Sequence, residues 1–129
     1  MAIISIVAAA MAAFVVGAIY YGAFAKSWMK AAQIHEDDAH MSVMLFVISF
    51  ICALVISAVM AFSLSALEAL SLTGGLMWGV IFWLGFCATT LIVNHRYQRK
   101  SISLTLIDGG HWLLVFLTIG AINGVFYSS

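Results

Sequence analysis

Residues 41–66 read MSVMLFVISFICALVISAVMAFSLSA, a stretch without a charged side chain. An α-helix rises about 1.5 Å per residue and needs about 20 apolar residues to cross a hydrocarbon core of about 30 Å, so this stretch is long enough to span a membrane. The whole chain has the same character: of its 129 residues 65% are hydrophobic and 8% are charged, with a mean hydropathy of +1.16. Such a chain cannot cover itself with a water-soluble surface, so its solvent is lipid.

The composition also excludes several classes of protein. Intrinsic disorder and nucleic-acid binding both require many charged residues, and a disulfide-stapled module requires many cysteines. The chain has five basic residues, five acidic residues and two cysteines. We therefore expect the lipid bilayer as a partner and no nucleic acid.

Three further apolar stretches resemble residues 41–66. They cover residues 3–25, 74–94 and 109–127. Proline is absent, so no span contains the residue that usually kinks a helix, and each helix can satisfy its own backbone hydrogen bonds in lipid. The sequence predicts an all-α membrane protein of one domain, residues 1–129, with four transmembrane helices in an antiparallel bundle.

The basic residues predict how these spans are oriented. Cytoplasmic loops of membrane proteins carry an excess of Lys and Arg. All five basic residues lie in the first and third connections, and none lies at the termini or in the second connection; they are Lys26, Lys30, Arg96, Arg99 and Lys100. We expect the first and third connections in the cytoplasm and both termini outside.

Small residues spaced by four predict where the helices pack. Helices in lipid associate through close backbone approach, so each ridge of small residues is compatible with a helix–helix contact. The candidate packing residues are Ala13 and Gly17, Ser57 and Ala61, Gly75 and Gly79, and Gly120 and Gly124, one pair in each span. We expect contacts within the bundle, and the alternative is a seam between copies in a dimer or trimer.

A weak internal repeat suggests that the bundle consists of two tandem hairpins. Residues 14–17 (FVVG) and residues 82–85 (FWLG) each precede a basic loop. Each loop is followed by an Asp-x-x-His pattern, which begins at Asp37 in the first half and at Asp108 in the second. Both halves would run in the same direction, as in a parallel repeat. Coincidence is the alternative, because few residues match.

Two regions resemble a known family. Residues 17–21 (GAIYY) and 24–31 (FAKSWMKA), followed by 83–90 (WLGFCATT) and 93–94 (VN), are similar to the signature regions of the bacterial membrane proteins grouped as domain-of-unknown-function family 1761. The resemblance covers nearly the whole chain. It implies a small four-helix integral membrane protein and transfers no catalytic residue. With the orientation above, we expect a multi-pass protein of the bacterial cytoplasmic (inner) membrane.

Asp108 and His111 form the sharpest candidate polar site. At positions i and i+3 they share a helical face, and Thr118 lies near the same face. If the helix begins near Ile102, Asp108 lies about 9 Å inside it, and an ionisable group there indicates a functional site. The simpler interpretation, which we favour, makes Asp108 the N-cap of a helix from residue 109. Residues 101–106 would then form an extended stretch, because polar and apolar side chains alternate there.

The remaining polar residues suggest structural roles. Asn94 and Asn123, near opposite membrane faces, are expected to make interhelical hydrogen bonds, and Asn94 is also a candidate for the polar site. The acidic residues 36–38 are read as the N-terminal signal of the second span. A metal or haem site between His40 and His111 is a less favoured hypothesis. We expect no cofactor.

The sequence is compatible with two functions. No motif of a soluble enzyme is present, so we expect a non-enzymatic protein that acts by assembly, as a homo-oligomer or as an accessory subunit of a larger membrane complex. The alternative is translocation of a proton or small solute along a polar path that includes Asp108, His111, Thr118 and Asn94.

Overall fold

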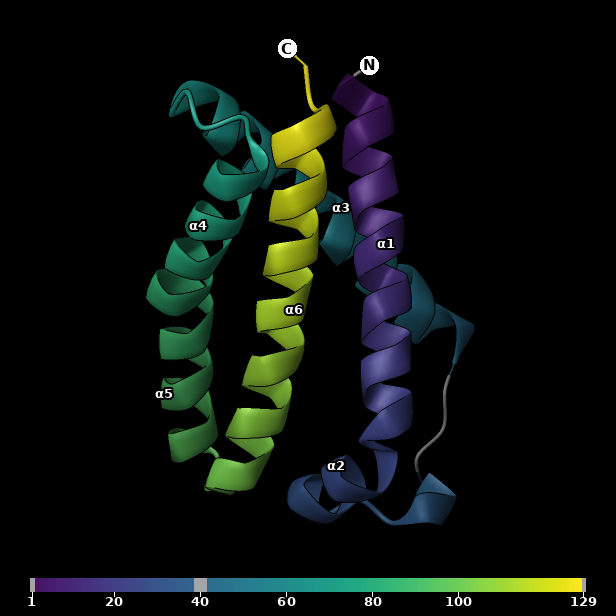
Figure 1. The fold of residues 1–129 in the computed structure, drawn as a ribbon. Helices are drawn as coiled ribbons and strands as arrows, with labels where there is room; N and C mark the ends of the chain where they lie inside the picture. Colours follow the sequence, from purple (N-terminus) through teal and green to yellow (C-terminus); the bar gives the residue numbers. More distant parts are fainter. Residues whose placement is uncertain (1, 39–41, 129) are drawn as a thin grey trace.

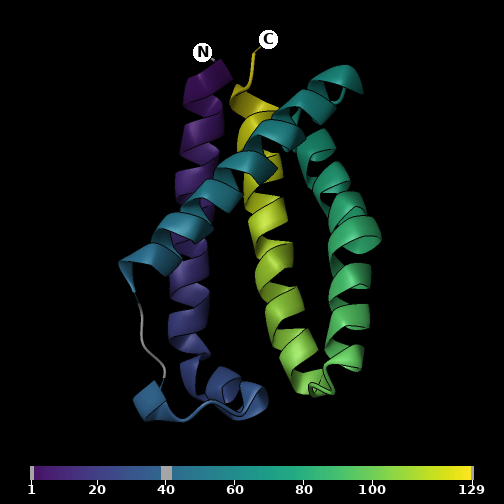
Figure 2. The ribbon, with the colours of Figure 1, turned by 180° about the vertical axis from the view of Figure 1, so that it is seen from behind.

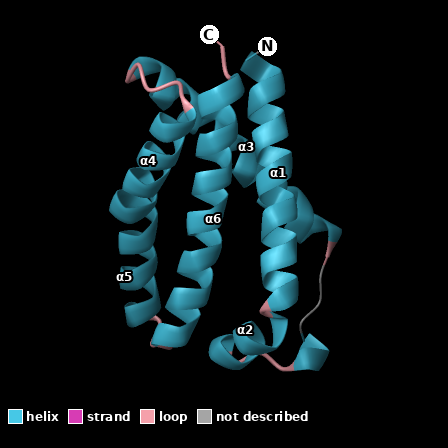
Figure 3. Cartoon of the chain, in the orientation of Figure 1, coloured by secondary structure: helices cyan, strands magenta, loops and turns pink. Residues whose placement is uncertain are grey.

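The computed structural model describes residues 2–38 and 42–128 and contains only helices and their connections there (Figure 3). Four helical segments are long and apolar enough to cross a membrane, and the third is one continuous span built from α4, η2 and α5. In chain order the elements are α1 (Ala2–Ala23), α2 (Ala25–Ala32), the 3₁₀ turn η1 (Glu36–Asp38), α3 (Val43–Ala66), α4 (Leu72–Phe82), the π-helical turn η2 (Trp83–Ala88), α5 (Thr89–Tyr97) and α6 (Ile102–Phe126).

The four spans form the expected antiparallel bundle. Both termini lie at one end, which we call the terminal end, and α2 and the α5–α6 connection lie at the other, the basic end (Figure 1). Helix α6 is central, because it packs against α1, α3 and α4. Helix α3 crosses α1 and α6 obliquely and lies in front of them in Figure 2, whereas α6 runs alongside α4 and α5. The chain thus traces two successive hairpins, but they differ in crossing geometry.

The fourth span starts earlier than we expected. Ser101 has extended backbone angles and its side chain accepts a hydrogen bond of 3.1 Å from the Leu104 amide, which makes it the N-cap of α6. The prediction that Asp108 caps this helix is therefore wrong, and so is the prediction of an extended stretch over residues 101–106. Asp108 lies seven residues after the cap, about 10 Å along the helix axis.

The first connection is also more ordered than a simple loop. Helix α2 lies across the basic end of the bundle, with Lys26 and Lys30 exposed and Trp28 half-buried (Figure 1). The acidic residues 36–38 form η1 and do not belong to the first turn of α3, which Ser42 caps through the Leu45 amide. The interpretation of these acidic residues as the start signal of the second span is therefore wrong. His40 lies outside the described residues.

The glycine ridges of α4 and α6 face each other. A Cβ atom added to Gly75 would collide with the Gly120 carbonyl, one added to Gly120 with the Gly75 carbonyl, and one added to Gly124 with the Ser71 carbonyl. A Cβ atom on Gly79 would lie 2.9 Å from the Phe116 carbonyl oxygen. These ridges are intramolecular contacts, because only glycine lets the two backbones approach so closely.

The other small residues pack within the same bundle. Ala13, Ser57 and Ala61 are almost completely buried, whereas Gly17 faces a histidine side chain, described below. The residues of the apolar core share full or nearly full burial and come from three helices: Ala9, Ala13, Met60, Leu64, Val115 and Ile119.

A buried polar group fastens the terminal end. Ser5 donates a hydrogen bond of 2.6 Å to the Asn123 side chain, and Asn123 donates one of 2.9 Å to Ser57. Ser57 in turn donates to the Ile6 carbonyl over 2.8 Å. These bonds link α1, α3 and α6, so the expected interhelical role of Asn123 is confirmed.

Candidate functional site

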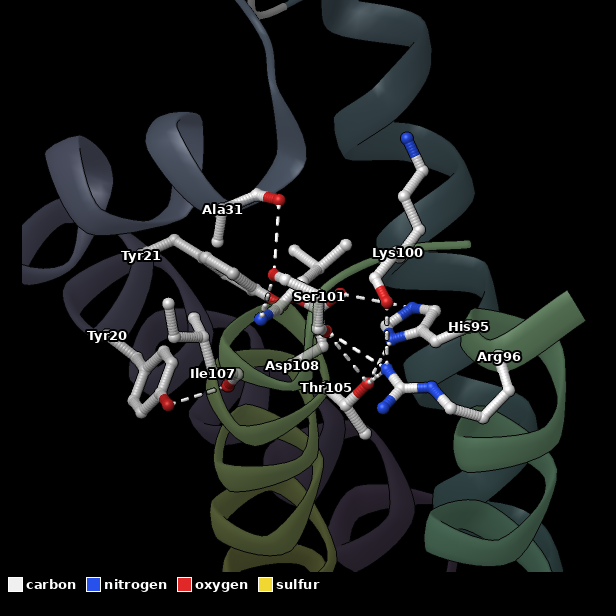
Figure 4. Close-up of polar contacts among 11 residues, drawn as sticks. Tyr20, Tyr21, Ala31, His95, Arg96, Lys100, Ser101, Thr105, Ile107 and Asp108 are labelled. Carbon is white, nitrogen blue, oxygen red and sulfur yellow. Dashed lines mark hydrogen bonds and ion pairs between the residues drawn. The ribbon is translucent and has the colours of Figure 1, made fainter. Parts of the chain in front are cut away.

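Asp108 lies between helices α1 and α5, inside the fourth span (Figure 4). Its side chain is 17% exposed. The Tyr21 hydroxyl donates a hydrogen bond of 2.6 Å to one carboxylate oxygen, and His95 Nε2 lies 3.7 Å from the other. One carboxylate thus joins three helices that meet at the basic end of the bundle.

His95 connects this carboxylate to the surface. Its Nδ1 lies 2.8 Å from the Thr105 hydroxyl, which can accept from a protonated ring nitrogen or donate to an unprotonated one. The exposed Arg96 donates a bond of 2.9 Å to the same hydroxyl and further bonds to the carbonyls of Lys100 and Ser101 (Figure 4). A series of contacts therefore runs from the exposed α5–α6 connection to Asp108: hydrogen bonds as far as His95, and then the 3.7 Å contact between His95 and the carboxylate.

His111 extends the cluster deeper into the span. Its ring packs against the rings of Tyr20, Tyr21 and Trp112, with the Tyr21 centroid 4.6 Å away. Its Nδ1 atom is buried and has no hydrogen-bond partner in the described part of the chain. His111 and Asp108 share a cluster through Tyr21, and the described contacts include no hydrogen bond between the two.

Two glycines make room for this cluster. A Cβ atom on Gly17 would lie 2.8 Å from His111 Nε2, and one on Gly110 would lie 2.7 Å from the Tyr20 hydroxyl oxygen. That hydroxyl donates a bond of 2.6 Å to the Ile107 carbonyl. Gly17 therefore accommodates an imidazole rather than a second backbone, which refines its expected packing role.

The π-helical turn determines which side chain of α5 faces Asp108. Gly75 and Gly79 define the side of α4 that contacts α6, and an uninterrupted α-helix would continue that side near residues 86, 90 and 93 at 3.6 residues per turn. It would place His95 on the opposite side. The turn η2 interrupts this period, and beyond it Ala88 and His95 are buried while Asn94 is exposed.

Thr89 and Thr90 satisfy the backbone of this turn. The Thr89 hydroxyl donates to the Gly85 carbonyl over 2.9 Å, and the Thr90 hydroxyl donates to the Phe86 carbonyl over 2.8 Å. Threonine side chains commonly compensate carbonyls freed by a distorted helix in lipid. These bonds explain why two threonines follow the turn.

The structure brings together only part of the predicted polar site. Asp108 and His111 lie in one cluster, as the functional interpretation requires. Thr118 donates to the Leu114 carbonyl of its own helix, two turns further along than His111, and Asn94 is exposed. The described contacts join neither residue to the cluster, so their place on a polar path stays a prediction.

Tyr20, Tyr21 and His95 were not among the predicted site residues. Tyr20 and Tyr21 lie in residues 17–21, one of the regions that resemble the family signature, and this was the sequence feature that could have indicated them. His95 carried no such signal, because an uninterrupted α-helical period places it on the side of the third span that faces away from α6. No group of three His, Cys, Asp or Glu side chains within metal-binding reach occurs among the described residues, and the suggested partner His40 falls outside them.

The geometry defines the class of protein: a multi-pass, four-helix membrane protein with an ionisable tyrosine–aspartate–histidine cluster at one end of the bundle. The chain belongs to the family described as proteins of unknown function (DUF1761), whose model matches residues 4–124. That range includes every residue of the cluster. No curated protein and no solved structure matches the chain.

Proposed function

We propose that the protein conducts a proton through the cluster around Asp108. The supporting observation is the position of Asp108 itself, which lies about 10 Å inside a transmembrane helix in contact with Tyr21 and His95. Ionisable residues inside a span are energetically costly, and chains of Asp, His and other titratable groups are typical of proton relays. A role in proton transfer would explain why a carboxylate lies at this depth.

The contacts favour a proton over a larger solute. Tyr21, Asp108, His95 and Thr105 follow one another at 2.6, 3.7 and 2.8 Å. At most one water molecule could separate groups this close, so no sugar, amino acid or hydrated metal ion passes between them. A proton can move along them by exchange between neighbouring groups.

One end of the relay reaches the surface of the protein, at the basic end of the bundle. Arg96 is exposed there, and Thr105 is half-buried beside Arg96. Beyond His111 the buried Val115 and Ile119 separate the cluster from the Asn123 group at the terminal end. We propose that this apolar segment is the closed part of the path and that water enters it when the path conducts.

The orientation is part of the proposal. The five basic residues of the chain occupy the basic end, so we place that end in the cytoplasm and both termini outside a bacterial inner membrane. The relay then exchanges protons with the cytoplasm. The protein carries out no covalent chemistry in this account.

Infrared difference spectroscopy on proteoliposomes tests whether Asp108 exchanges a proton. Acidification protonates the exposed carboxylates in every variant, and in wild type and in Asp37→Asn, which changes an exposed aspartate of η1, it should add a separate carboxyl component from Asp108. That component should be missing in Asp108→Asn. The proposal fails if the spectra of wild type and Asp108→Asn coincide.

A further inference from the structure

The Thr105 hydroxyl lies between a guanidinium and an imidazole at the surface end of the relay. Arg96 donates to its oxygen over 2.9 Å, and His95 Nδ1 lies 2.8 Å from the same oxygen (Figure 4). The Ser101 carbonyl oxygen is a second possible acceptor, at 3.4 Å. A hydroxyl has one proton to donate, so its direction decides whether His95 Nδ1 faces a donor or an acceptor.

Arg96 favours one direction of this hydroxyl. A guanidinium stays charged and has no acceptor atom, so the hydroxyl must turn its oxygen toward Arg96 and its proton away. The Ser101 carbonyl is the more distant acceptor. It already faces the Arg96 side chain at 3.0 Å and the Thr105 amide at 3.4 Å, and a carbonyl oxygen has two lone pairs. When the imidazole is neutral, the hydroxyl proton therefore points to His95 Nδ1.

The opposite side of the imidazole ring favours the same arrangement. His95 Nε2 faces the Asp108 carboxylate over 3.7 Å, and a negative charge favours a proton on the nitrogen beside it. Only 10% of the His95 side chain is exposed, so water offers the ring few other partners. The bond made by one ring nitrogen determines which nitrogen carries the proton. Both contacts therefore favour a neutral ring protonated on Nε2.

We propose that Arg96 is a positioning residue of the relay, which acts through Thr105 to keep the proton of neutral His95 on Nε2, facing Asp108. In one transfer the carboxylate takes the Nε2 proton and Nδ1 takes the hydroxyl proton of Thr105, while water at the exposed connection returns a proton to the hydroxyl oxygen. The positive charge of Arg96 stabilises that oxygen as it releases its proton. This role rests on the proposed function, whereas the tautomer can be measured whether or not the protein conducts.

Nitrogen NMR of the protein in lipid bilayers measures the tautomer, at an alkaline pH at which imidazoles are neutral. Each ring nitrogen is identified by its neighbouring carbon, Cγ for Nδ1 and Cδ2 for Nε2. The signals of His95 are those missing from the spectrum of His95→Asn. In wild type the proton should reside on Nε2 of this ring.

The contribution of Arg96 is measured with Asp108→Asn present, because the carboxylate would otherwise favour the Nε2 proton by itself. Adding Arg96→Met removes the guanidinium and should raise the ratio of Nδ1-protonated to Nε2-protonated rings about fivefold, as expected for the loss of one hydrogen bond. Arg99→Met is the matched control, since it removes an exposed arginine from the same connection. It should leave the ratio unchanged.

Two variants of Thr105 give the same comparison without changing any charge. Thr105→Val should act like Arg96→Met, and Thr105→Ser, which keeps the hydroxyl, should act like Arg99→Met. A wild-type ring protonated on Nδ1 or on both nitrogens would overturn the proposal. So would equal ratios in the two methionine variants, or in the Val and Ser variants. Failure of proton flux with the tautomer confirmed would instead contradict the proposed function alone.

Discussion

Tyr21 and Asp108, 87 positions apart in the chain, are joined by a hydrogen bond of 2.6 Å inside the membrane-spanning bundle. The bond fixes the basic end of α1 against α6, and it brings the Tyr21 ring onto His111. Tyr21 therefore connects Asp108, on the surface side of the proposed relay, to His111, which lies deeper in the span.

Replacement of Tyr21 by Phe tests the value of this bond. Tyr21→Phe keeps the ring and removes the hydroxyl, so we expect the free energy of unfolding in detergent to fall by about 1 kcal/mol, the usual worth of an interhelical hydrogen bond. Tyr97→Phe is the matched control, because Tyr97 is 87% exposed. Equal thermal stability of the two variants would contradict a contribution of the bond to the fold.

The glycine contact between α4 and α6 predicts a large effect of one methyl group. Gly75→Ala places a Cβ atom against the Gly120 carbonyl, so the helices must separate, at a cost of about 1–3 kcal/mol. Gly85→Ala is the control in the same span, because nothing lies within 4 Å of its added Cβ atom. If both variants melt at the same temperature, α4 and α6 do not approach as closely as described.

The sequence predicted the architecture better than the site. Span number, the bundle contacts of the glycine ridges and the role of Asn123 follow from apolar length and small-residue spacing, which depend on local composition. Asp108 was misplaced because Gly109 and Gly110 look like a helix start, while the actual cap, Ser101, lies about two turns before Asp108. Gly110 leaves space for the Tyr20 hydroxyl, whereas a Cβ atom on Gly109 would meet only the Leu91 side chain, at 3.9 Å.

The π turn caused the second error. A strict α-helical period from Gly75 and Gly79 places residues 86, 90 and 93 toward the bundle and His95 away from it. The turn η2 breaks this period and His95 is buried beyond it, and the sequence carries no local signal for such a turn. The directions of the α5 side chains, which follow the turn, could therefore be known only from the tertiary structure.

Two single-residue deletions test the π turn directly. Deletion of Gly85 should convert η2 to an ordinary α-helical turn and leave His95 facing Asp108, because a π turn holds one residue more than an α turn. Deletion of Ile92 lies beyond the turn and should rotate His95 by about 100° away from Asp108. Cysteines at positions 95 and 108, joined by a short thiol cross-linker, measure the contact.

Cross-linking in the first deletion variant and not in the second is the expected result. The opposite pattern would show that η2 does not set the direction of His95. Both variants are compared in the background that lacks the native cysteines, so that only the introduced pair reacts.

Reporter fusions test the orientation. Alkaline phosphatase fused to the C-terminus should be active and green fluorescent protein at the same place should be dark, because in the proposed orientation the five basic residues lie at the cytoplasmic end. A fluorescent C-terminal fusion without phosphatase activity would place the relay opening on the extracytoplasmic side.

Proton flux into liposomes tests the central claim most directly. Purified protein in potassium-loaded vesicles is driven by a valinomycin potential, and the internal pH is followed with a trapped dye. Wild type and Asp37→Asn should conduct equally well, while Asp108→Asn should lower the initial rate about tenfold or more, as expected when the titratable group of a proton path is removed. A wild-type rate no faster than that of empty vesicles, or an equal rate in wild type and Asp108→Asn, would contradict the proposed function.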